Sequence, residues 1–307
     1  MTPTRLAAAF ARFEAAPPPL RAAVFATLSA LFFSCMSALI RHAGTELHPF
    51  EVVFFRNILA LAFMMPWLAG VGISAMRTQR LGGHVLRALF SLGGMLCGFT
   101  AVTLIPITEA TALGFTAPLF STMGAALILG ETVRLRRWTA IIVGFAGTMI
   151  VLRPGIEGLS LGSLLAIANA AFAASSILVV KSLSRTERPE VVVTYMTLIL
   201  TPLSLIPALF VWQWPSLEML GWLTALAFCG TVGHIFMTRA FGAADVTVVL
   251  PFDFAKLPFT ALIAFTIFGE IPTVWTWIGG AVIFVATFYI AHRETVLARQ
   301  RRAAGGT

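Results

Sequence analysis

A carboxylate and a lysine lie three residues apart in one of the most apolar parts of the chain. Asp253 and Lys256 belong to the segment VVLPFDFAKLPFTALIAF. A charge at the centre of a bilayer costs about 2.5 to 3.5 kcal/mol on insertion scales, so it needs a partner or water. At helical spacing the two side chains share a face and can neutralise each other. The pair could bind a zwitterionic or polar ligand in a cavity, or it could lock two helices together.

Five further polar residues in apolar segments could contact a ligand or carry a proton. Arg56 and Tyr195 could hydrogen-bond a carboxylate, a phosphate or a ring system. Alternatively, Arg56 extends to the lipid headgroups or pairs with Glu109, which could itself act as a gate. Asn169 could border a ligand cavity or a close crossing of helices that carry small residues. His234 could relay protons, or it could be an ordinary packing residue.

The elements that must position these residues are long apolar runs. Of the 307 residues, 58% are apolar and 11% charged, against about 45–50% and 25% in soluble domains. A helix needs about 20 apolar residues to span a bilayer. Continuous apolarity, without the alternation of barrel strands, favours helices. We therefore expect an all-α integral membrane protein with ten transmembrane helices, at roughly 22–42, 50–71, 84–105, 109–130, 138–153, 161–182, 190–212, 218–238, 246–268 and 274–291.

The basic residues predict how the chain is oriented in the cell membrane. Lysine and arginine are enriched in cytoplasmic connections. Here they gather in the connections that would lie on the same side of the membrane as the N-terminus, whereas the connections on the other side carry little beyond Arg41 and Arg153. Both termini should be cytoplasmic, with residues 1–21 as a tail and residues 292–307 as a basic tail. Arg87 should extend to the headgroups. The net charge of +8 is thus interpreted as a topology signal, without a nucleic-acid partner.

The chain repeats itself at an offset of 139 residues. Residues 51–53 and residues 190–192 both read Glu-Val-Val, and the offset holds without a gap when residues 22–152 are compared with residues 161–291. Both copies carry a Gly-Glu pair, at 130–131 and 269–270, which we interpret as a helix end followed by a helix start. Five helices per copy is an odd number, so the second copy should enter the membrane upside down. Such inverted repeats recur in secondary transporters.

The repeat also bears on the Asp253–Lys256 pair. The equivalent positions in the first copy are Gly114 and Ala117, which are small and neutral. A purely architectural ion pair would more naturally recur in both copies. This asymmetry favours a ligand-binding role for the pair.

With these features the chain resembles the drug/metabolite transporter superfamily, specifically its EamA-type ten-helix carriers. The resemblance is carried by LHPFEVVFFRN at 47–57, by EATALGFTAPLFSTMGAALILGE at 109–131 and by the second copy at 246–270. It extends from about residue 22 to residue 291. LHPFEVVFFR and PFDFAKLPF are most similar to the branch that includes S-adenosylmethionine and riboflavin uptake carriers. The resemblance implies alternating access around a central cavity between two repeats, at 22–153 and 161–291.

These observations predict a secondary transporter for a small polar metabolite, such as an amino-acid-like or nucleoside-like compound or a vitamin. The alternatives are an exporter of the same fold, a membrane-embedded enzyme and a channel. The sequence has no GxxxxGK[ST] loop for ATP and no HExxH, paired-carboxylate or Ser/His constellation for an enzyme. We expect no cofactor and no metal. The expected partners are the substrate and the bilayer, and the chain is expected to be a monomer or a homodimer.

Overall fold

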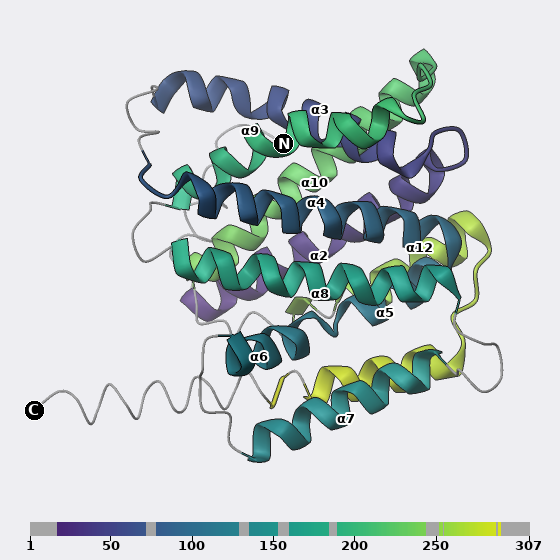
Figure 1. Cartoon of the computed structure of the whole chain (residues 1–307). Coiled ribbons are helices and arrows are strands. Elements are labelled where there is room, and N and C mark those ends of the chain that lie inside the picture. Colours follow the sequence, from purple (N-terminus) through teal and green to yellow (C-terminus); the bar gives the residue numbers. More distant parts are fainter. Residues whose placement is uncertain are drawn as a thin grey trace, which may run out of the picture.

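The structure, a computed structural model, describes residues 17–71, 78–128, 135–152, 160–183, 189–243, 252–253, 255–286 and 288–289. The described chain is α-helical, as predicted (Figure 1). Its helices are α2 (Pro18–Ala43), α3 (Pro49–Val71), α4 (Leu81–Leu104), α5 (Ile107–Gly114), α6 (Ala117–Ile128), α7 (Leu135–Leu152), α8 (Leu161–Leu183), α9 (Pro189–Leu209), α10 (Leu217–Ala243) and α12 (Lys256–Phe268). A further apolar helix covers Val274–Ala286. The Gly-Glu pair at 130–131, Arg153 and the C-terminal tail at 292–307 lie outside the described residues.

The first helix begins earlier than predicted. α2 starts at Pro18, inside the segment that we assigned to the N-terminal tail, and Pro17 precedes it with an extended backbone (φ −52°, ψ 139°). Proline cannot donate a backbone hydrogen bond, but the first turn of a helix requires none, and the fixed φ of proline suits a helix. The prolines therefore start this helix.

The fourth predicted span is interrupted, which corrects the expectation of one continuous helix at 109–130. α5 ends at Gly114, and α6 begins at Ala117. Between them Thr116 begins a new helical turn, and its carbonyl accepts a hydrogen bond from the N–H of Leu119 at 2.9 Å. Pro118 explains the interruption, because proline has no N–H to donate to the carbonyl of Gly114 four residues earlier.

The ninth predicted span has a turn at the equivalent place. α12 begins only at Lys256, and Ala255 before it donates its N–H to the carbonyl of Phe252 at 3.1 Å. The offset of 139 residues places Ala255 on Thr116 and Lys256 on Ala117. Both copies therefore begin a new helix at the same repeat position.

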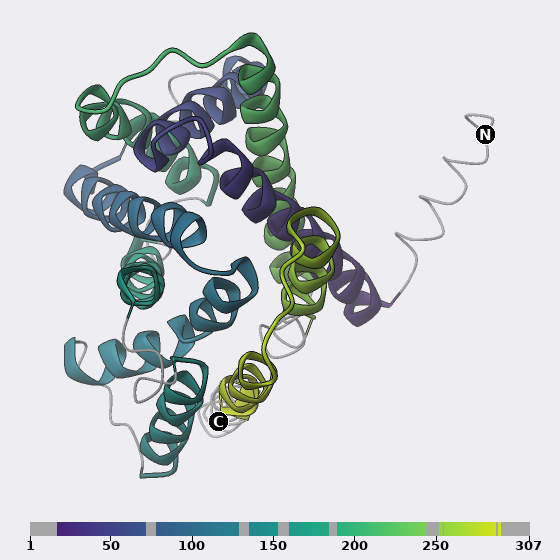
Figure 2. The same cartoon turned by 90° about the vertical axis from the view of Figure 1, so that its right-hand side faces the viewer.

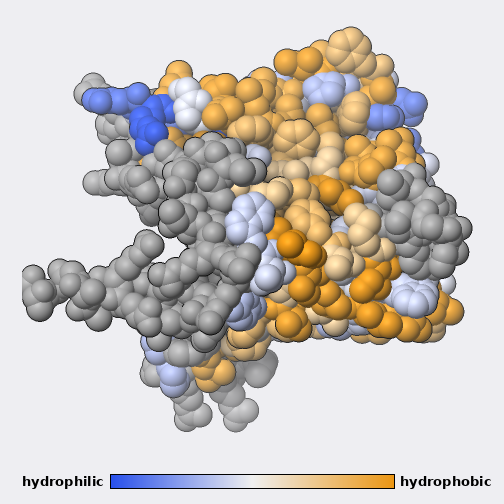
Figure 3. Space-filling model, turned by 60° about the horizontal axis from the view of Figure 1, so that its bottom comes forward, coloured by the Kyte–Doolittle hydropathy of each residue, from blue (hydrophilic) through white to orange (hydrophobic). Residues whose placement is uncertain are grey.

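Large apolar side chains cover the outside of the helices, and Figure 3 shows one face on which hydrophobic residues predominate. Exposed examples are Leu31, Leu86, Ile142, Leu164, Ile206, Phe228, Leu262 and Phe265. Buried polar side chains include Ser29, Ser34, Arg56, Asn57, Thr148, Thr194 and Thr201. Soluble proteins do not expose such extensive apolar surface. The distribution fits helices whose outer faces contact lipid.

Three described segments are long and apolar enough to span a bilayer by themselves, namely Leu20–Ala43, Leu81–Leu104 and Leu217–Met237. Shorter apolar helical segments cover Ile141–Val151, Leu161–Ser176, Thr194–Leu209, Lys256–Phe268 and Val274–Ala286. Two of the ten predicted spans fall short because the helix is interrupted within them, after Gly114 and before Lys256.

The most extensive helix contacts join the two sequence copies. α2 packs against α10, and α4 packs against α8; these pairs lie on opposite sides of the molecule in Figure 2. A Cβ atom at Gly233 of α10 would lie 3.2 Å from the ring of Phe33 on α2, and one at Gly94 of α4 would lie 3.4 Å from Cβ of Phe172 on α8. The offset relates Gly94 to Gly233 and Phe33 to Phe172, so equivalent residues make equivalent contacts.

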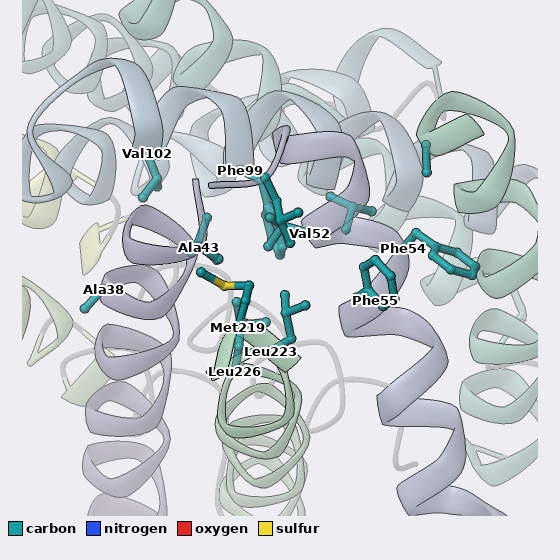
Figure 4. Packing of buried hydrophobic residues seen from close by; sticks show 14 of the residues in the cluster. Ala38, Ala43, Val52, Phe54, Phe55, Phe99, Val102, Met219, Leu223 and Leu226 are labelled. Carbon is teal, nitrogen blue, oxygen red and sulfur yellow. The ribbon is translucent and has the colours of Figure 1, made fainter. Parts of the chain in front are cut away.

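An apolar core fixes α2, α3, α4 and α10 near one end of the molecule (Figure 4). Its labelled members include Val52 and Phe55 of α3, Phe99 of α4 and Met219 and Leu223 of α10. Because four helices meet here, the core determines where the polar residues farther along these helices lie.

Candidate functional site

Asp253 and Lys256 form an ion pair at the interrupted ninth span. Lys256 Nζ lies 2.5 Å from Asp253 Oδ1, and both side chains are partly buried. Lys256 Nζ also lies 4.9 Å from the ring centroid of Phe33 on α2, a favourable cation–π distance. The structure thus brings the two predicted residues together, but around the first residue of α12 rather than along one continuous helix.

A hydroxyl cluster connects the beginning of α12 to α2. The Thr260 hydroxyl donates to Ser34 Oγ at 3.0 Å. Ser34 Oγ lies 2.9 Å from the carbonyl of Ala30 and 3.2 Å from the carbonyl of Lys256. These contacts hold the backbone of Lys256 against α2 and so fix the position of the ion pair.

Arg56 is buried on α3. Its Nη1 donates to Asn57 Oδ1 at 3.0 Å. Its guanidinium lies over Gly230 of α10, where a Cβ atom would be 3.3 Å from Arg56 Nη2 and 3.0 Å from Sδ of Met36. Because only 7% of Arg56 is exposed, it does not extend to the headgroups, and its hydrogen bond goes to Asn57 rather than to Glu109.

Glu109 lies in the first turn of α5 and accepts a hydrogen bond from the Ser163 hydroxyl at 3.0 Å. Ser163 belongs to the first turn of α8, where its N–H donates to the hydroxyl of Ser160. Glu109 thus joins two helix starts that belong to different sequence copies.

His234 lies on α10 with an exposed side chain. Its ring packs edge to face against Phe33 of α2, with centroids 4.9 Å apart. The same Phe33 ring lies 4.9 Å from Lys256 Nζ, so His234 and Lys256 contact one aromatic side chain. Within the described part of the chain, no three His, Cys, Asp or Glu residues are grouped as metal ligands would be.

Tyr195, the repeat equivalent of Arg56, lies at the contact between α9 and α4. Its ring stacks on His84 with centroids 4.6 Å apart. In the same contact Arg87 Nη1 donates to the carbonyl of Val192 at 2.8 Å. The expectation that Arg87 extends to the headgroups is therefore wrong, because a backbone carbonyl of a neighbouring helix satisfies the guanidinium.

Asn169 lies at the crossing of α8 with α4. A Cβ atom at Gly98 would be 2.9 Å from Asn169 Cγ, and one at Gly94 would be 3.3 Å from Asn169 Oδ1. Of the two interpretations given for Asn169, this position matches the close crossing of helices with small residues.

A charged cluster joins the two copies where α2, α4 and α12 end. Arg41 Nη2 lies 2.6 Å from Glu270 Oε1, and Arg41 Nη1 donates to the carbonyls of Val102 at 3.1 Å and Ile105 at 2.7 Å. Glu270 Oε2 accepts the N–H of Ile107, the first residue of α5, at 3.1 Å. We refer to Arg41, Glu270 and these backbone groups as the end cluster.

The end cluster could not be predicted from the sequence, where Glu270 reads as part of a helix connection. Gly269 does end α12 as predicted, with a left-handed backbone (φ 67°). A signal was present in Arg41, one of the few basic residues on the side of the chain where lysine and arginine are rare.

A second carboxylate connects the copies near the same end. Glu51 in the first turn of α3 is fully buried. Its Oε2 accepts the N–H of His48 at 3.2 Å, as the third residue of a helix does in a capping box. Its Oε1 accepts the N–H of Gln213 at 2.5 Å, from the connection between α9 and α10. The repeated Glu-Val-Val motif was the sequence signal for this residue.

Comparison with known proteins gives consistent matches over nearly the whole chain. The EamA-like transporter family matches residues 20–153 and 160–291. The chain is 34% identical over 295 residues to a riboflavin transporter of Vibrio cholerae, covering 92% of this chain and 97% of that protein. It is 31% identical to an S-adenosylmethionine uptake transporter of Rickettsia prowazekii, covering 87% of this chain and 91% of that protein.

It is also 28% identical over 282 residues to a pseudopaline exporter of Pseudomonas aeruginosa, covering 88% of this chain and 96% of the exporter. A solved crystal structure shares the fold, with a TM-score of 0.61 and 22% identity, covering 89% of this chain and 98% of that one.

Proposed function

Because this chain belongs to the EamA-like transporter family, we propose that it is a secondary transporter that moves a small polar metabolite across the cytoplasmic membrane by alternating access. One observation carries the proposal: both sequence copies begin a new helix at the same repeat position, and Asp253 and Lys256 flank that position in the second copy. Paired interruptions of this kind mark the substrate sites of transporters built from repeats.

The proposed topology has ten transmembrane helices in two inverted repeats, at 22–153 and 161–291, with both termini in the cytoplasm. The equivalent helix pairs α2 with α10 and α4 with α8 support the repeat. The excess of basic residues on the side of the N-terminus supports the orientation. The chain acts as a monomer or a homodimer.

The proposed substrate site lies around the beginning of α12. Lys256 and His234 both contact the ring of Phe33, and Arg56 lies over Gly230, one helical turn before His234 on α10. The residues proposed to bind substrate are Asp253, Lys256, Arg56, Asn169 and Tyr195, and those proposed as gate or proton relay are Glu109 and His234. The partly buried Asp253–Lys256 ion pair between α12 and α2 supports a polar hollow inside the molecule.

In the proposed orientation the end cluster closes the outer side. Arg41 holds Glu270 and two carbonyls near the end of α4, while Glu270 holds the first N–H of α5. An outward opening between the copies must separate Arg41 from Glu270. The described structure then corresponds to a state closed toward the outside.

Riboflavin is the first candidate substrate, since a riboflavin transporter is a relative that matches over almost its whole length. Export is the alternative direction, which the similarity to the pseudopaline exporter supports. Counterflow in proteoliposomes tests the function: liposomes preloaded with unlabelled riboflavin should accumulate labelled riboflavin faster than empty ones. Flux that does not saturate would indicate a channel, and a chemically altered product would indicate an enzyme.

Substitution of the ion pair tests the site. Asp253→Asn and Lys256→Gln should each lower uptake by about tenfold or more, because a charged hydrogen-bonding partner contributes about 1.5–3 kcal/mol. The double variant should transport no better than either single one. Membrane abundance is measured in parallel. Singles that disappear from the membrane, together with a double variant that returns, would instead show that the pair only stabilises the fold.

A further inference from the structure

Two buried hydrogen-bond donors beside the proposed site have no acceptor. Arg56 is 7% exposed and Asn57 is 1% exposed. Although Arg56 Nη1 donates to Asn57 Oδ1, Arg56 Nε and Asn57 Nδ2 have no acceptor among the residues that the structure describes. A buried donor without a partner loses its hydration without compensation. A bound acceptor would therefore stabilise this arrangement.

The donor pair, defined as Arg56 and Asn57, adjoins the same face of α10 as the rest of the site. Arg56 lies over Gly230, where the missing side chain leaves room for the guanidinium. His234 follows one helical turn later and shares that face. It contacts Phe33, which also lies beneath Lys256. The donors are thus close to the groups that we propose to hold the substrate.

The charges around His234 are predominantly positive. Lys256 is neutralised by Asp253. Arg56 and Arg87 hydrogen-bond an amide oxygen and a backbone carbonyl, and neither forms an ion pair with any carboxylate that the structure places. Because Arg56 is buried and has no carboxylate partner among the described residues, it repels a positively charged ligand and attracts negative or acceptor-rich groups.

We propose that Arg56 Nε and Asn57 Nδ2 recognise carbonyl or carboxylate oxygens of the substrate, and that the substrate carries no net positive charge. The inference rests on the proposed transport function and narrows its substrate class. It makes Asn57 a specificity-determining residue. Riboflavin fits this class, since it is uncharged and carries two carbonyl oxygens on its pyrimidine ring. S-Adenosylmethionine, with its sulfonium cation, fits it poorly.

Asn57→Asp separates recognition from support of the fold. The aspartate keeps an oxygen for Arg56 Nη1 but replaces the Nδ2 donor with a second acceptor. We expect the Kd for riboflavin to rise about tenfold or more, with unchanged membrane abundance and thermal stability. Arg56→Lys keeps the charge but loses the planar Nε donor, and it should weaken binding similarly. The matched control is Arg239→Lys, an exposed position on α10, which should bind as wild type.

Binding is measured on the purified protein by riboflavin fluorescence and by thermal stabilisation with riboflavin or S-adenosylmethionine. The inference is overturned if Asn57→Asp binds riboflavin as tightly as wild type, or if wild type binds S-adenosylmethionine more tightly than riboflavin. Counterflow is measured separately. A wild-type protein that binds riboflavin but shows no counterflow would reject the transport function and leave the recognition by Arg56 and Asn57 standing.

Discussion

Glu51 illustrates how much depends on single polar residues inside this molecule. Its two carboxylate oxygens accept one N–H at the start of α3 and one from the connection before α10. Hydrogen bonds to a charged group are stronger than neutral ones. Because the carboxylate is fully buried, losing one of them leaves a desolvated donor behind.

Replacing Glu51 should therefore destabilise the protein. Glu51→Gln puts an NH2 group against one of the two N–H donors, and we expect a loss of about 1.5–3 kcal/mol of stability, seen as a lower melting temperature in detergent. Glu218→Gln is the matched control, since Glu218 also lies in the first turn of a helix but is exposed. Equal melting temperatures for the two variants would contradict this role.

From the sequence, a contact could be predicted only between site residues that lie close together along the chain. Asp253 and Lys256 are three residues apart, so helical geometry alone predicted their contact. Arg41 and Glu270 come from opposite ends of the chain, and only the packing of α2 against the end of α12 brings them together. The unpartnered Nδ2 donor of Asn57 could not be predicted from the sequence either, because burial without a partner is a property of the packed structure.

The helices themselves followed from apolar run length, but their interruptions did not. The chain is apolar on both sides of Phe115–Thr116, and a proline inside a membrane helix is often tolerated because neighbouring helices satisfy the freed groups. α9 shows such tolerance, since it continues through Pro202 and Pro207. Whether a given proline ends a helix thus depends on its surroundings rather than on local sequence.

The interruption between α5 and α6 should be needed for transport. Pro118→Ala restores an N–H donor to the carbonyl of Gly114 and favours one continuous helix. We expect transport to fall several-fold at normal membrane abundance, with slower hydrogen exchange around Thr116. Pro202→Ala, at an exposed position within α9, should change neither quantity. Unchanged transport in Pro118→Ala would show that the interruption is only tolerated.

At the scale of the whole molecule, the end cluster and Glu51 both join the two copies at the same end. Arg41 connects α2 with the end of α12, and Glu51 connects α3 with the segment before α10. Several charged hydrogen bonds must break if this end is to open. These charged contacts therefore add to the apolar packing of α2, α3, α4 and α10.

Reversing one charge of the end cluster should favour the outward-open state. Arg41→Glu places two carboxylates together, so a cysteine introduced by Ser37→Cys, one turn further inside α2, should react several-fold faster with an impermeant maleimide from outside. In the protein that carries these variants, Cys35, Cys97 and Cys229 are replaced by other residues. Adding Glu270→Arg should slow the reaction again.

The control for this experiment is Glu218→Arg, which changes the charge at the same end without touching an ion pair that the structure describes. Equal reaction rates for Arg41→Glu and Glu218→Arg would show that the end cluster does not close the outer side.

The packing of α2 against α10 and of α4 against α8 joins the two sequence copies. This has a consequence for proteins of half this size. α2 finds its main neighbour in the second copy, and α8 finds its own in the first. In a polypeptide with only one copy, each of these helices would lack the neighbour against which it mainly packs. With the proposed topology, such a short chain could fold stably only as two molecules inserted in opposite directions, each supplying the neighbours that the other lacks.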